Sequence, residues 1–101
     1  MKSILTCGAA LVSIAFAGTA AAKSGDQVYQ ATCAACHATG VANAPRYGNK
    51  GDWAARAKLG RDALVASVMK GKGAMPPKGG DPKLSESDVK NAVDHLLKAV
   101  R

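Results

Sequence analysis

The sequence predicts an all-α fold of about four helices joined by long loops. Capping-box spacing at Ser24 and Ser85 marks two helix starts, because each serine can accept a hydrogen bond from the backbone three residues on. Apolar residues recur at helical spacing from Val89 to Val100. Segments 38–49 and 71–80 are rich in glycine and proline, which break such a period, so both are predicted to be loops.

The first 22 residues of the 101-residue chain have the pattern of a secretory signal. Lys2 is followed by an apolar run from Ile4 to Ala17 and then by small residues, which predicts cleavage after Ala22. A transmembrane anchor is the alternative, but the run is short of the ~20 residues that a span needs. We therefore expect a cleaved signal peptide (1–22), a single mature domain (23–101) and a periplasmic location.

The first mature helix is predicted from Gly25 to about Ala35, and it leads into the motif Cys33-Ala34-Ala35-Cys36-His37. Cys-x-x-Cys-His is typical of covalent haem attachment. On a helix, residues three and four apart share a face, so both sulfurs and the imidazole point to one side. The sulfurs would form thioethers with the haem vinyl groups, and His37 would bind the iron.

Three other uses of this motif are less consistent with the chain. A thioredoxin-like redox pair needs a βαβ context, which the pattern lacks. A zinc site needs about four ligands, and only His95 could join the three residues of the motif. A disulfide between residues three apart on a helix has poor geometry.

The central segments are predicted to support His37. Loop carbonyls near Ala44 and Pro45 are the candidates to accept from its second ring nitrogen. A short helix from Trp53 to Leu59 would be capped by Asp52. Trp53 has two open roles, a core residue or an indole donor to a haem propionate.

A third helix, residues 63–70, would be capped by Asp62 and would end at Gly71. In the loop that follows, Met75 is the one large apolar side chain, and Pro76 and Pro77 stiffen the backbone that presents it. Met75 is therefore the predicted sixth iron ligand, with Met69 and His95 as alternatives.

The last helix carries one buried face. Ser85 and Asp88 form its predicted capping box, and Leu84 can pack on Val89 across the helix start. His95 lies at the edge of the apolar stripe, where packing or solvent contact is expected.

The charge suggests the kind of partner. The net charge is +7, or +6 once Lys2 has left with the signal, which favours an acidic partner surface. Export and the lack of a nucleic-acid-binding motif argue against nucleic acid. The lysines expected to frame the haem edge are Lys50, Lys70, Lys72, Lys78 and Lys83. We expect no stable membrane insertion and a monomer.

Taken in order, the haem motif and later segments resemble a class I c-type cytochrome, most closely the small bacterial cytochrome c-five type. The later segments are Ala44-Pro45, Asp52-Trp53, Gly73 to Pro77 and the terminal helix. The resemblance implies helices and loops wrapped around one covalently bound haem c. It also implies that the first and last helices cross at Gly25 and Tyr29, with His95 where the family usually has an aromatic residue.

The resemblance further implies one-electron transfer rather than enzymatic catalysis. Two strong axial ligands leave no open iron position, and His/Met ligation raises the potential. The expected function is a freely diffusing periplasmic carrier between respiratory redox partners. Two alternatives are a dedicated cytochrome subunit of an oxidoreductase complex and a five-coordinate haem sensor of gases, which would need Met75 away from the iron.

Overall fold

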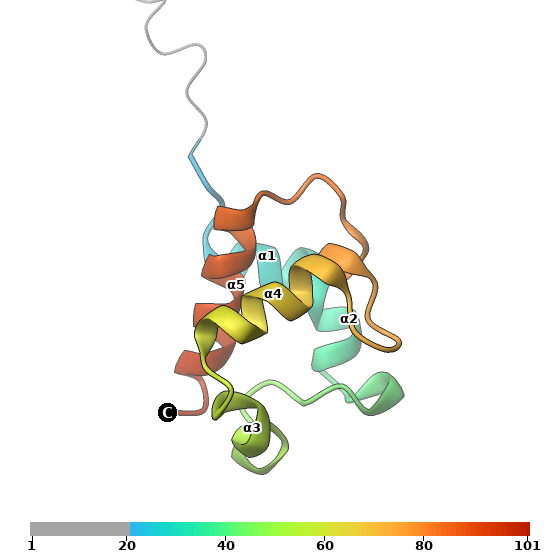
Figure 1. Cartoon of the computed structure of the whole chain (residues 1–101), viewed down its shortest axis with the longest axis vertical. Helices are drawn as coiled ribbons and strands as arrows, with labels where there is room; N and C mark the ends of the chain where they lie inside the picture. Colours follow the sequence, from blue (N-terminus) through green and yellow to red (C-terminus); the bar gives the residue numbers. More distant parts are fainter. Residues whose placement is uncertain (1–20) are drawn as a thin grey trace, which may run out of the picture.

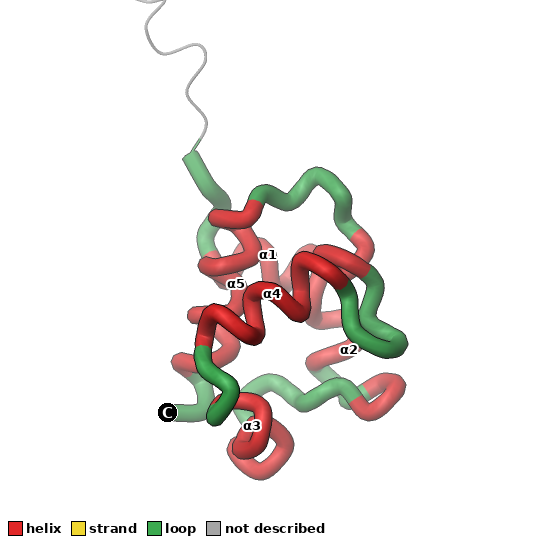
Figure 2. The backbone as a smooth tube through the Cα atoms, in the orientation of Figure 1, coloured by secondary structure: helices red, strands yellow, loops and turns green. Residues whose placement is uncertain are grey.

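The computed structural model describes residues 21–101, which fold into helices joined by long loops (Figures 1 and 2). The helices are α1 (Gly25–Val28), α2 (Ala34–His37), α3 (Lys50–Ala57), α4 (Arg61–Lys70) and α5 (Glu86–Lys98). Within residues 21–101 there is no β-strand, only a single bridge between Lys72 and Met75. The expected all-α class is confirmed. All but the last two residues of the expected signal peptide lie outside the described residues.

One continuous helix carries the haem motif, because a π-helical turn (Tyr29–Cys33) joins α1 to α2. The backbone stays right-handed through this turn, with φ −59° at Tyr29 and −61° at Ala34. Counting α1 and α2 as one helix gives the predicted four. The capping box at Ser24 is confirmed, since its hydroxyl accepts from the Gln27 N–H at 3.1 Å. The helix continues to His37, two residues beyond its predicted end.

The first and last helices cross at Gly25, as the resemblance implied (Figure 1). A Cβ at this position would lie 2.2 Å from the carbonyl oxygen of Asn91 on α5. Only glycine therefore allows this approach of the two backbones. The capping box that begins α5 is also confirmed, with the Ser85 hydroxyl accepting from the Asp88 N–H at 3.0 Å.

The core consists of two apolar clusters, and the side chain of Cys33 packs against both. The larger cluster joins α1, α4 and α5 through Val28, Leu64, Val65, Leu84, Val89, Ala92 and Val93. The smaller cluster contains Tyr29, Trp53 and Leu96. The buried face predicted for the last helix is therefore confirmed at Val89, Ala92, Val93 and Leu96, and Leu84 lies in the same buried cluster as Val89.

The structure corrects the predicted starts of two helices. α3 begins at Lys50, because the side chain of Asn49, not that of Asp52, caps it by accepting from the Asp52 N–H at 2.9 Å. α4 begins directly after Gly60, whose φ of +92° turns the chain, so Asp62 lies inside the first turn and does not cap it. No helix in residues 21–101 is long and apolar enough to cross a membrane.

Candidate haem-binding site

An apolar cavity of about 340 Å³ lies between the helices and is partly open to solvent. Its walls come from α2 and the loop after it, from α3, α4 and α5, and from the loop of residues 71–80 that carries Met75, called the methionine loop below. Five of the residues that line it are Cys36, His37, Pro45, Trp53 and Met75. Five of the six predicted site residues therefore meet at one cavity, although they span 40 positions of the sequence, from 36 to 75.

His37 is held from two sides at the end of α2. Its Nδ1 lies 2.8 Å from the carbonyl oxygen of Pro45, and its own carbonyl accepts from the Tyr47 N–H at 2.7 Å. Because a carbonyl only accepts, Nδ1 carries the proton of the neutral ring and Nε2 keeps its lone pair for a metal. The predicted support of His37 by the Pro45 carbonyl is confirmed.

Trp53 forms part of the core and part of the cavity wall. The residue is 5% exposed, and its ring stacks against that of His37 with centroids 5.8 Å apart. Its indole N–H donates to the carbonyl oxygen of Arg46 at 2.8 Å. The single indole hydrogen is thus engaged within the protein, which supports the core role, and the role as a donor to a haem propionate stays a prediction.

The methionine loop presents Met75 to the cavity. Its backbone is clamped to Lys72 by two hydrogen bonds of 2.9 Å, one in each direction. Gly71 makes this possible, because its φ is +87° and a Cβ there would lie 2.9 Å from the Met75 carbonyl oxygen. Met69 instead packs against the larger core cluster, and His95 lies against the rings of Tyr29 and Tyr47. Neither alternative ligand is part of the cavity wall.

The two cysteines differ in their surroundings. Cys36 is exposed and lines the cavity, whereas Cys33 is half-buried between the two core clusters. Burial raises the pKa of the Cys33 thiol, and the neighbouring Cys36 raises it further. Within residues 21–101, no three His, Cys, Asp or Glu side chains gather where they could hold a metal ion by themselves. The zinc alternative therefore gains no support.

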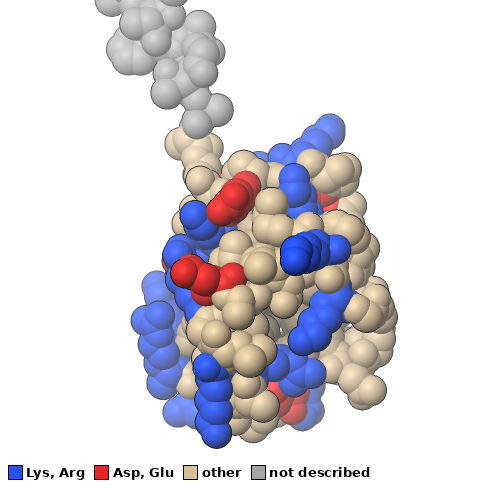
Figure 3. All heavy atoms as spheres, viewed as in Figure 1, with Lys and Arg blue, Asp and Glu red and all other residues tan. Residues whose placement is uncertain are grey.

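Basic and apolar side chains meet at the rim of the cavity. Of the five lysines predicted there, only Lys72 lines it, together with Arg56, which the sequence reasoning missed. Arg56 lies one turn after Trp53 on α3, and this helical spacing could have identified it as a neighbour of the site. Val41 and Leu59 also line the cavity and remain 52% and 57% exposed. Figure 3 shows Lys and Arg spread over the drawn face, with fewer Asp and Glu.

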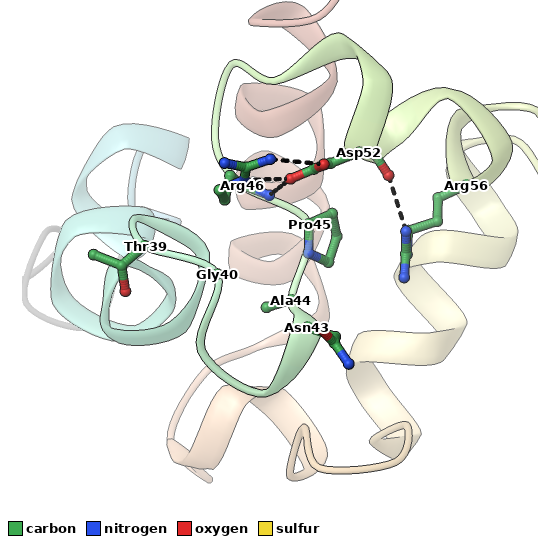
Figure 4. A pocket seen from close by; sticks show the side chains of 8 residues that line it. All are labelled: Thr39, Gly40, Asn43, Ala44, Pro45, Arg46, Asp52 and Arg56. Atoms are coloured by element: carbon green, nitrogen blue, oxygen red, sulfur yellow. Dashed lines mark hydrogen bonds and ion pairs between the residues drawn. The ribbon is translucent and has the colours of Figure 1, made fainter.

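A second, polar pocket shares Asn43, Ala44, Pro45 and Arg56 with the apolar cavity (Figure 4). Here Arg46 binds Asp52 through two bonds, Nε–Oδ2 at 2.6 Å and Nη2–Oδ1 at 3.1 Å. The Arg46 side chain and backbone lower the pKa of the Asp52 carboxyl to about 2. Arg56 donates to the Asp52 carbonyl at 2.9 Å and reaches both pockets. These contacts fasten the loop to α3 and so hold the Pro45 carbonyl beside His37.

The donor set of the apolar cavity fits a haem. An imidazole with a free Nε2 and a thioether face it from separate segments, and two thiols lie on the helix at its edge. An all-helical chain with a Cys-x-x-Cys-His motif at such a cavity is a small protein with a covalent haem.

Comparison with known proteins narrows this class. Residues 20–96 match the family described as cytochrome c oxidase, cbb3-type, subunit III. The chain is 45% identical over 77 residues to cytochrome c5 of Azotobacter vinelandii, covering 74% of this chain and 93% of that one. The chain therefore belongs to the family of class I monohaem cytochromes c.

Two further similarities agree with this assignment. Cytochrome c-555 of Chlorobaculum tepidum is 43% identical over 94 residues, covering 89% of this chain and 87% of that one. A cytochrome c solved in an electron transfer complex with nitrite reductase is 48% identical, with a TM-score of 0.73 over 76% of this chain and 94% of that one. The chain is thus a small electron carrier with one covalent haem c, and not an enzyme.

Proposed function

We propose that the chain is a periplasmic one-electron carrier that shuttles electrons between respiratory redox partners. In this proposal Cys33 and Cys36 attach the haem, and His37 and Met75 are its axial ligands. The observation that carries it is the meeting of His37 and Met75 at one apolar cavity, with Nδ1 of His37 engaged by the Pro45 carbonyl. The bound haem iron supplies reversible one-electron chemistry.

The protein's own residues restrict what this site can do. If His37 and Met75 both bind the iron, no position would be left open for a gas, which favours electron transfer. The hydrogen bonds hold the ring of His37 and the backbone of Met75 in place, so we expect little rearrangement on a change of oxidation state. This preorganisation favours the carrier over the five-coordinate sensor.

The rim of the cavity is the proposed docking face for an acidic redox partner. Arg56 and Lys72 provide positive charge there, and Val41 and Leu59 provide a small exposed apolar centre. Complementary charge accelerates encounter more than it raises affinity, which suits a carrier that must also dissociate. The related cytochrome c in complex with nitrite reductase supports docking to a redox enzyme. We also propose a monomer.

The proposed location rests on the signal pattern of residues 1–22, with cleavage after Ala22 and residues 23–101 as the mature protein. Haem attachment to two thiols is compatible with a compartment outside the cytosol. Cell fractionation followed by a haem stain tests the location, and haem protein found only in the cytosol would exclude it.

The decisive experiment on the site is absorption spectroscopy of the oxidised and reduced protein, with and without carbon monoxide. We expect the weak long-wavelength band of iron–thioether ligation in the oxidised protein and no spectral change on adding carbon monoxide. Met75→Ala should lose the band and bind carbon monoxide. Met69→Ala, the matched control against the core, should keep the band and show no spectral change with carbon monoxide. Ready carbon monoxide binding by the native protein would contradict the electron carrier and support the five-coordinate haem sensor.

A further inference from the structure

Among the described residues, Lys23 makes the first polar contacts with the domain. The backbone N–H of Lys23 donates to Oδ1 of Asp88 at 2.8 Å, and its carbonyl accepts from the side-chain amide of Asn91 at 2.9 Å. Both partners lie on α5, 65 and 68 positions away in the sequence. Ala21 and Ala22, just before it, are exposed. These two hydrogen bonds form a clamp between Lys23 and α5, and this clamp therefore starts at the first residue after the expected cleavage site.

Asp88 is the buried acidic group of this clamp, with 7% of the residue exposed. Its second oxygen accepts from the Ser85 N–H at 3.0 Å as part of the capping box. The backbone N–H groups of Ser85 and Lys23 lower the pKa of its carboxyl, so Asp88 is ionised at neutral pH. In the uncleaved chain, one amide hydrogen of Lys23 faces this buried negative charge.

Cleavage after Ala22 changes the chemistry of that nitrogen. Hydrolysis by a signal peptidase breaks the amide bond between Ala22 and Lys23 with one water, whose hydroxyl goes to the Ala22 carbonyl carbon. The remaining hydrogen goes to the Lys23 nitrogen, which becomes an amine and takes a further proton from solvent at neutral pH. A neutral donor is thus replaced by an ammonium with a positive charge and three donors.

We infer that removal of the signal peptide creates an ion pair between the new α-ammonium group of Lys23 and the carboxylate of Asp88, which locks the mature N-terminus onto α5. This inference rests on the proposed export with cleavage after Ala22. The nitrogen already lies at hydrogen-bond distance from the carboxylate, and the Asn91 amide holds the same residue from its other end. No rearrangement is needed for the pair to form, so processing itself strengthens the fold.

The test compares two haem-loaded proteins that differ only at the N-terminus. One has the native sequence, and the other carries Gly-Ser inserted between Ala22 and Lys23, so that cleavage leaves two residues ahead of the clamp. Mass spectrometry establishes each N-terminus, and guanidinium unfolding measures stability. We expect the extension to lower the folding equilibrium constant by about fivefold at low salt, the size of a favourable partly exposed ion pair.

The role of Asp88 is tested by a double-mutant cycle. In Asp88→Asn the effect of the extension should disappear, whereas in Glu86→Gln, which removes an exposed charge from the same first turn, it should persist. An equal effect in Asp88→Asn, or none in the native background, would overturn the inference.

One further experiment distinguishes an error in the predicted cleavage site from an error in the inferred ion pair. The same proteins can be released from a fusion partner by a protease that leaves Lys23 first, which fixes the N-terminus independently of the cell. A mature protein that starts elsewhere in the cell would refute the cleavage site. Equal stability of the released proteins with and without the extension would refute the ion pair.

Discussion

The crossing of α1 and α5 provides a quantitative test of the structure through Gly25→Ala. The added Cβ would lie 2.2 Å from the Asn91 carbonyl oxygen and 2.8 Å from Cβ of His95. Ordinary contacts begin at 3.4 Å, so the two helices must separate by about 1.2 Å, the difference between these two oxygen distances. The clash involves backbone and a Cβ, neither of which can rotate away.

The cost follows from what this crossing buries. Val28 on α1 and Val89 on α5 are each 1% exposed, so a shift of about 1 Å loosens the best-packed part of the core. A gap of this size removes roughly a quarter to a half of the dispersion energy of the facing atoms. Overpacking of this kind typically costs about 1–3 kcal/mol. The higher helix propensity of alanine returns little here, because it applies to helix interiors and Gly25 is the first residue of α1. We therefore expect a net loss of about 2 kcal/mol.

Thermal unfolding of the haem-loaded protein, followed by circular dichroism, measures this loss. A decrease of about 2 kcal/mol corresponds to a Tm lower by roughly 8–16 °C in a domain of this size. Gly51→Ala is the matched control, because a Cβ on this helical residue meets only the Asn49 side chain at an ordinary 3.4 Å. It should be neutral or stabilising. Equal Tm values for Gly25→Ala and the native protein would refute the close crossing.

Three further predictions concern the site. Asp52→Asn should flatten the acid side of the stability curve, measured by urea unfolding at several pH values. The folded pKa of about 2 lies below the ordinary 3.8, so the stability that the carboxylate adds is complete above the ordinary value and is lost as pH falls toward about 2. Trp53→Phe should cost about 1–2 kcal/mol in denaturant unfolding, because it leaves the Arg46 carbonyl without its donor, but it should leave the haem spectrum unchanged. Gly71→Ala should displace Met75 and allow carbon monoxide to bind, because its Cβ would meet the Met75 carbonyl at 2.9 Å.

Each of these predictions can fail. If stability falls with pH in Asp52→Asn as steeply as in the native protein, the ion pair with Arg46 does not contribute to the free energy of unfolding. A changed haem spectrum in Trp53→Phe would instead support the prediction that the indole N–H donates to the haem. For Gly71→Ala the control is Gly73→Ala, which also has a positive φ but whose added Cβ would meet no atom within 4 Å, so it tests backbone strain without the clash. Equal carbon monoxide binding by both variants would contradict the role of the clash.

Local patterns predicted most of the site. The Cys-x-x-Cys-His motif, the two capping boxes and the stiff loop around Met75 are each encoded within a few residues. The structure brings the end of the motif and the loop around Met75 to one cavity. The support of His37 by the Pro45 carbonyl was also predictable, since a metal-binding imidazole needs an acceptor and only a short loop follows it.

The remaining features depend on competition between neighbouring polar residues or on single hydrogen bonds. Both Asn49 and Asp52 have side chains suited to capping α3, and the choice is decided by Arg46, which takes the Asp52 carboxylate. The role of Trp53 depends on the direction of a backbone carbonyl, which no residue type reveals. The π-helical turn adds one residue to a hydrogen-bonded ring, a change too small to alter the apolar period.

The position of Cys33 between the two core clusters has a consequence for how the protein is made. Cys33 becomes half-buried once α1, α4 and α5 have packed, so an enzyme that attaches the haem would reach it more easily while the polypeptide is still open. If the proposed export and the proposed attachment through Cys33 hold, ligation would follow translocation and precede complete folding. A variant that folds too early would escape ligation, so the best substrate for the maturation machinery is a chain that folds slowly until its cofactor is in place.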